Sequence, residues 1–108
     1  MDYLLKQAKQ FLSIVETSTL KDEEIKLLIR SGILELERSG IDTKYNYSIE
    51  TEQFDSLITT AIMFYVKSTF GNVDIKEKEY ALRTFNTLEQ SLSLSDGYRK
   101  KSDSLWEQ

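Results

Sequence analysis

The 108-residue sequence contains no cysteine, no histidine and no proline, and it has only four glycines. Without cysteine there can be no disulfide, no thiolate nucleophile and no cysteine-based zinc site. Without histidine the chain lacks a serine–histidine triad, an imidazole general base and the commonest metal ligand in proteins. The glycines, at positions 32, 40, 71 and 97, do not have the spacing of a phosphate-binding loop or a dinucleotide-binding fingerprint. These absences exclude much of ordinary enzyme chemistry.

Acidic residues outnumber basic ones. The chain has 18 Asp and Glu against 14 Lys and Arg, for a formal net charge of −4. Tight nonspecific binding to nucleic acid depends on neutralising phosphates, so this balance argues against a broad basic binding face. The content of 40% apolar and 30% charged residues is typical of a soluble globular domain, and no apolar run approaches the ~20 residues of a membrane span. No signal peptide is predicted at the N-terminus, because charged residues interrupt the apolar stretch that such a peptide requires.

Helical periodicity marks four segments, in which apolar residues recur at spacings of three and four. The predicted helices cover approximately residues 2–16, 21–39, 51–70 and 75–92. The residues expected to face the core are Leu4, Ala8, Phe11, Leu12 and Val15 in the first helix, Ile25, Leu28, Ile29, Gly32, Ile33 and Leu36 in the second, Phe54, Leu57, Ile58, Ala61, Ile62 and Tyr65 in the third, and Ala81, Leu82, Phe85, Leu88 and Leu92 in the fourth.

Signals for helix ends support these boundaries. The acids at 22–24 suit a helix N-terminus, Gly40 and Gly71 suit helix ends, and Thr51 is a good N-cap for the third helix. Residues 41–50 break the helical period and predict a long loop, with a strand-like piece at 45–49. The sequence therefore predicts an all-α fold, with about four helices in a compact bundle at 1–93 and a flexible C-terminal arm at 94–108.

The predicted helices carry more apolar residues than one face requires. In the third helix, Met63, Val66 and Phe70 lie roughly opposite the main apolar stripe, and in the second helix Leu27 and Leu34 lie off it. A helix with apolar residues on two sides is buried on two sides. Two interpretations stay open: the third helix is the central helix of the bundle, or these five residues form a subunit interface.

No arrangement of side chains points to catalysis. The carboxylate pairs Glu35/Glu37 and Glu77/Glu79 have an i, i+2 spacing, which directs two side chains of a helix apart and favours solvated faces. The acids at 22–24 are explained by a helix N-terminus without any cation. We therefore expect no enzymatic activity, no cofactor and no metal site.

The order of these segments resembles the small head–tail connector proteins of long-tailed bacteriophages, also called adaptor, head-completion or DNA-packaging proteins. The resemblance covers residues 4–98. The first two matching segments are the N-terminal LLKQAKQFL and then LKDEEIKLLIRSGILELERSG, a predicted helix that begins with an acidic turn and ends at a glycine. The third, FDSLITTAIMFYVKSTFGN, is similar to the family's central apolar helix. The fourth, FNTLEQSLSLSDGY, is similar to the family's last helix.

The resemblance implies a structural virion protein, made in the host cytoplasm, that forms a ring of commonly twelve subunits beneath the portal. Such a ring connects the phage head to the tail and extends the DNA channel. The implied partners are other copies of the chain, the portal protein, the next head-completion or tail protein, and double-stranded DNA that passes without sequence-specific binding; no membrane is implied. In similar connectors a C-terminal segment contacts the portal, which makes Tyr98, Arg99, Lys100, Lys101 and Trp106 candidates for portal contact.

Two other functions remain open at this point. One is a small helical protein-interaction or regulatory module that acts as a monomer or dimer. The other is a weak DNA-binding regulator, which would need positive charge clustered on a folded helix. The symmetry of assembly separates a ring from a regulatory module, and salt-dependent affinity for DNA tests the third possibility.

Overall fold

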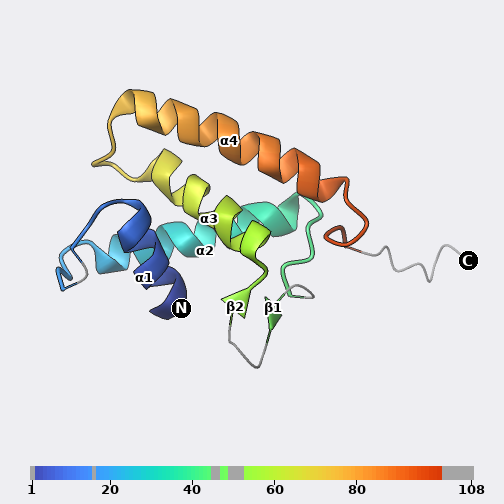
Figure 1. Cartoon of the computed structure of the whole chain (residues 1–108), viewed down its shortest axis with the longest axis horizontal. Helices are drawn as coiled ribbons and strands as arrows, with labels where there is room; N and C mark the ends of the chain where they lie inside the picture. The colour runs from blue at the N-terminus through green and yellow to red at the C-terminus, as the bar shows by residue number, and fades with distance from the viewer. Residues whose placement is uncertain (1, 16, 45–46, 49–52, 101–108) are drawn as a thin grey trace, which may run out of the picture.

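The computed structural model describes residues 2–15, 17–44, 47–48 and 53–100, and it shows an all-α fold of four helices, as the sequence predicts. Two short strands, β1 (Tyr47–Ser48) and β2 (Gln53–Phe54), pair in antiparallel fashion between the second and third helices. Figure 1 shows the arrangement. The helices are α1 (Asp2–Phe11), α2 (Asp22–Arg38), α3 (Ser56–Thr69) and α4 (Ile75–Ser93). No helix in the described ranges is long and apolar enough to cross a membrane.

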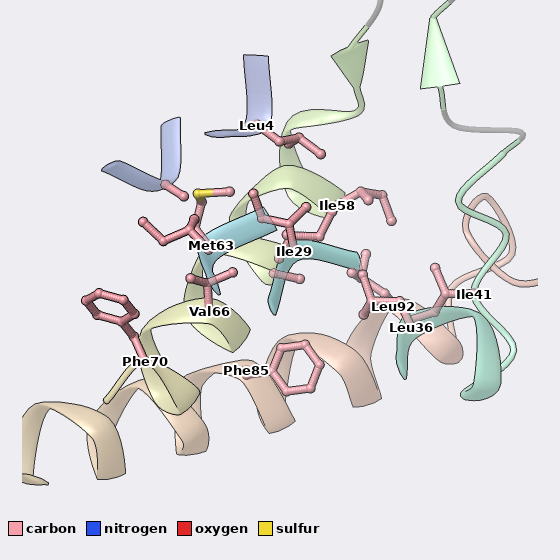
Figure 2. Packing of buried hydrophobic residues seen from close by; sticks show 14 residues of the cluster. Leu4, Ile29, Leu36, Ile41, Ile58, Met63, Val66, Phe70, Phe85 and Leu92 are labelled. Carbon is pink, nitrogen blue, oxygen red and sulfur yellow. The ribbon is translucent and has the colours of Figure 1, made fainter. Parts of the chain in front are cut away.

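Helix α3 is the centre of the bundle. It packs against each of the other three helices, with α4 along one side and α1 and α2 along the other (Figure 1). Met63, Val66 and Phe70 are buried in the chain's own core, in the same cluster as Ile29 of α2 and Phe85 of α4 (Figure 2). The two-sided apolar pattern of this helix thus corresponds to its central position. These three residues present no surface to another subunit.

The core is built mainly from branched aliphatic side chains. Each large side chain that is fully buried contributes about 1.5–3 kcal/mol relative to its exposure to water. The cluster comprises Leu4, Ala8, Ile25, Ile29, Leu36, Ile41, Ile58, Ala61, Ile62, Met63, Val66, Phe70, Phe85 and Leu92.

The approach of α2 to α3 depends on Gly32. A Cβ atom at this position would lie 3.0 Å from Cδ2 of Tyr65, closer than side-chain atoms normally pack. The Tyr65 ring itself makes an edge-on contact with Phe85 of α4, with the ring centroids 5.3 Å apart. The absence of a side chain at Gly32 therefore lets α2 pack closely on α3.

The C-terminal end of α2 confirms the prediction for Gly40. Gly40 has a φ of +90°, its N–H donates to the Glu37 carbonyl, and the next N–H, of Ile41, donates back to the Leu36 carbonyl. This is the Schellman pattern, in which a left-handed glycine lets the last carbonyls of the helix find partners. Ile41 and Leu36 are both fully buried (Figure 2), which supplies the apolar contact that accompanies the motif.

Some predicted boundaries and core positions were wrong. Helix α1 ends at Phe11 rather than 16, and Ser13 follows with a φ of +61°, so Val15 lies outside the helix with 69% of its surface exposed. Leu57 and Leu82 are also exposed, by 44% and 48%. Leu57 sits in the first turn of α3. Helix α4 packs mainly on α3, which leaves Leu82 outside its narrow buried stripe.

Helix α3 begins later than predicted. The Asp55 side chain accepts a hydrogen bond from the Leu57 N–H at 2.9 Å and caps the helix at that point. Thr51, the predicted cap, lies outside the described residues. Phe54 belongs to β2, where it pairs with Tyr47 of β1. The strand-like piece expected at 45–49 is therefore present in part, as β1.

Candidate interaction surfaces

The segment after α4 folds back onto the chain that leaves α2. The Asp42 N–H donates to the Tyr98 carbonyl, and the Lys100 N–H donates to the Gly40 carbonyl, both at 2.7 Å. Between these two bonds, Ile41 and Arg99 form an antiparallel bridge. The first part of the expected C-terminal arm, residues 94–100, is therefore attached to the bundle.

Two side chains reinforce this attachment. The Tyr98 hydroxyl donates to Asp55 Oδ2 at 2.8 Å, and this hydrogen bond raises the pKa of Tyr98, with burial and then the Asp55 charge adding to the effect. The Lys100 ammonium lies 2.9 Å from Glu37 Oε1. Burial raises the pKa of Glu37, but hydrogen bonds from Thr43 and Lys100 outweigh it and lower the pKa overall. The attachment thus uses one neutral–charged hydrogen bond and one ion pair.

Three of the five candidates for portal contact lie in this segment. Tyr98 is half-buried, whereas Arg99 and Lys100 are exposed, and Arg99 forms an ion pair with Asp96 at 2.8 Å. Lys101 and Trp106 lie outside the described residues. The structure therefore places the basic side chains at 99 and 100 on the surface near the end of α2.

An apolar groove lies between α2 and the β1–β2 pair. Its volume is about 580 Å³. The Tyr47 and Phe54 rings meet edge-on across the strand pair, with centroids 5.0 Å apart. The lining residues are Ile33, Leu34, Glu37, Thr43, Lys44, Tyr47 and Phe54. The sequence does not predict this groove; its local signal is the pair of aromatic residues at positions 47 and 54.

Helices α2 and α4 each expose more than one apolar side chain. On α2, Leu27 is 59% exposed and Leu34 is 68% exposed, and the two lie two turns apart on the same face. On α4, Ile75, Tyr80 and Leu82 are exposed. Since α3 lies between α2 and α4, these are two different faces of the molecule (Figure 1). Leu27 and Leu34 are thus available for contact with another molecule.

As predicted, the side chains of Glu35 and Glu37 point in different directions. They are not simply solvated, however, because each contacts other groups of the protein. Glu37 turns toward Thr43 and Lys100, whereas Glu35 makes a bidentate contact with Arg38 at 2.7 and 2.8 Å. The hydrogen bond from Arg38 is the main cause that lowers the pKa of Glu35.

Glu89 of α4 completes the contact between the ends of α2 and α4. It accepts a hydrogen bond from the Ser39 hydroxyl, and burial together with the neighbouring Glu35 raises its pKa. The Glu89 carboxyl group therefore helps to hold α4 against the end of α2.

Among the described residues, no group of three or more acidic side chains is placed to hold a metal ion. Asp22, the first of the acids at the start of α2, forms an ion pair with Lys9 of α1 at 2.7 Å, and both side chains are largely buried. This pair joins α1 to α2. It gives Asp22 a structural role.

Comparison with known protein families gives a match over most of the chain. A family model described as phage connector protein matches residues 4–99. The matched region contains nearly all of α1, the other three helices, the strand pair and the attachment of Tyr98 to Asp55. No curated protein and no solved structure matches the chain.

Proposed function

We propose, from the premise that the chain belongs to the phage connector protein family, that it forms a ring beneath the portal. In this role it is a structural protein of the virion that joins the phage head to the tail and lengthens the channel for DNA. The family match over residues 4–99 is the observation that carries the proposal.

The exposed apolar faces support assembly through unlike surfaces. A ring closes through heterologous interfaces, in which one face of a subunit meets a different face of the next. The chain offers one such face on α2, with Leu27 and Leu34, and another on α4, with Leu82. Met63, Val66 and Phe70 take no part in this interface, because they fill the core of each subunit.

The remaining partners are assigned from the net charge of the chain and from its C-terminal arm. A net charge of −4 suits a channel wall, since repulsion of phosphates lets DNA slide where a basic lining would hold it. Portal contact is assigned to the arm, through Arg99 and Lys100 on the surface and through Lys101 and Trp106 beyond them. The downstream face of the ring would meet the next head-completion or tail protein. We assign the protein no enzymatic activity.

Mass in solution over a concentration series, with negative-stain images of the most concentrated sample, tests the proposal. A ring of about a dozen subunits with an open centre is expected, formed either by the free protein or in a complex purified with the portal protein of the same genome. A compact dimer that does not bind the portal would contradict the connector role and favour a regulatory module.

A further inference from the structure

We propose that the groove between α2 and the β1–β2 pair binds the chain's own C-terminal segment through Leu105 and Trp106. The proposal concerns the free chain, in which Leu34 makes no ring contact and Trp106 makes no portal contact. It commits to one occupant, the segment of the same molecule that follows Lys100.

The place where the described chain ends is the first argument. Lys100 is held by its N–H to the Gly40 carbonyl at 2.7 Å, and its ammonium lies 2.9 Å from Glu37 Oε1. Glu37 is itself a lining residue of the groove. Lys100, the last described residue, therefore lies beside a lining residue of the groove. Trp106 is six residues further on, and six extended residues span up to about 20 Å.

The chemistry of the groove is the second argument. Four of its lining residues are apolar or aromatic: Ile33, Leu34, Tyr47 and Phe54. Leu34 and Tyr47 are exposed although they line a concave surface. A volume of about 580 Å³ lies within the range of pockets that bind small apolar groups, roughly 300–1,000 Å³. Such a surface favours an apolar occupant, because covering it removes apolar area from water.

The composition of the segment is the third argument. Residues 101–108 read KSDSLWEQ, so Leu105 and Trp106 are its only large apolar side chains. Asp103 and Glu107 flank this pair, and the groove carries Lys44 among its lining residues. Opposite charges around an apolar contact favour one orientation of the segment. Because Lys100 is fixed to the bundle only a few residues before them, Leu105 and Trp106 also have a high local concentration at the groove.

Trp106 is the single tryptophan of the chain, so its fluorescence reports directly on the proposed contact. With excitation selective for tryptophan, the folded wild-type chain should emit at shorter wavelength than the chain unfolded in urea. Quenching by acrylamide should be several-fold weaker in the folded chain. Wild-type emission equal to that of the unfolded chain would overturn the proposal.

Leu34→Asp tests the groove, and Leu27→Asp is the matched control. Both replace an exposed leucine on the same face of α2, but only Leu34 lines the groove. Leu34→Asp should move the emission to longer wavelength and raise acrylamide quenching several-fold, whereas Leu27→Asp should change neither. Circular dichroism should show unchanged helix content in both variants. Equal effects of the two substitutions, or no effect of Leu34→Asp, would refute docking in this groove.

Dilution distinguishes docking within one molecule from docking of a second copy of the chain. Docking within one molecule does not depend on protein concentration, so the wild-type emission should stay constant over a hundredfold dilution. A shift to longer wavelength on dilution would show that the groove binds another copy, which contradicts the proposal. Because these measurements use the isolated chain without the portal, their failure leaves the ring to be tested separately.

Discussion

The Tyr98 hydroxyl donates its hydrogen bond to Asp55 Oδ2, the same oxygen that caps α3 by accepting from the Leu57 N–H. One carboxylate oxygen therefore serves both the start of the central helix and the attachment of the segment after α4. The sequence predicts a flexible arm from residue 94, but this contact helps to fix residues 94–100 to the bundle.

Tyr98→Phe should lower the free energy of unfolding by about 1–2 kcal/mol, because it removes a hydrogen bond to a charged acceptor at a partly exposed site. Urea denaturation measures the change. Tyr80→Phe is the matched control, since Tyr80 is exposed on α4 and the substitution keeps its ring, and it should change stability by less than about 0.5 kcal/mol. Equal effects of the two substitutions would contradict the role of the Tyr98 hydroxyl.

The same contact predicts a difference at alkaline pH. The pKa of Tyr98 is raised above its ordinary value of 10.0, mainly by the hydrogen bond to Asp55. A pKa raised by folding means that the stabilisation is fully present below the unfolded-state pKa and is lost as pH rises through the folded-state value. The stability difference between wild type and Tyr98→Phe should therefore be constant up to about pH 9 and shrink above it. Urea denaturation of both proteins at several pH values checks this, and a constant difference up to pH 11 would contradict it.

Glu89→Gln should increase stability at neutral pH. Burial and the neighbouring Glu35 raise the pKa of Glu89, so its ionised form is disfavoured in the folded protein. The contribution of Glu89 to the stability of the folded protein is therefore greatest below its unfolded-state pKa, and it falls as the pH rises through the raised folded-state pKa. Glutamine keeps an acceptor for the Ser39 hydroxyl without the charge.

The advantage of Glu89→Gln over wild type should accordingly grow between pH 4 and pH 7, as measured by thermal or urea denaturation. Glu79→Gln, at an exposed position of the same helix, is the control and should show little change over this range. A neutral-pH loss of stability in Glu89→Gln would show that the ionised carboxylate is needed.

Gly32→Leu should destabilise the protein by about 1–3 kcal/mol or more, the typical cost of overpacking a core. The new side chain would meet Tyr65, which cannot yield easily because its ring packs against Phe85. Arg30→Leu, at an exposed position on the same helix, is the control and should be nearly neutral. If Gly32→Leu were as stable as Arg30→Leu, the close packing of α2 on α3 would be wrong.

Much of the helical fold follows from local sequence signals. The apolar period locates all four helices, and Gly40 gives the end of α2 because only a glycine readily adopts its positive φ. The role of α3 does not follow from local signals. The periodicity shows two apolar sides, but only the packing of α1, α2 and α4 around α3 shows that both are covered within one chain.

The interaction surfaces are less predictable for the same reason. The exposure of Leu27 and Leu34 follows from their position off the main stripe of α2. The groove and the attachment of Tyr98 to Asp55 join residues far apart in sequence, and no local pattern specifies such pairs. The start of α3 was misplaced because Thr51 and Asp55 are both good N-caps, and the strand pair that precedes the helix favours the second.

Assembly through unlike faces can be tested by mixing two surface variants. Leu27→Asp alters the α2 face and Leu82→Asp alters the α4 face, and neither residue belongs to the buried core. Each variant alone should fold but fail to form the ring or bind in multiple copies to the portal. Mixed in equal amounts, the intact α4 face of the first can meet the intact α2 face of the second, so heterodimers should appear in native mass spectrometry. An interface between two α2 faces would instead be abolished by Leu27→Asp and untouched by Leu82→Asp, and mixing would restore nothing. That outcome would favour a dimeric module over a ring.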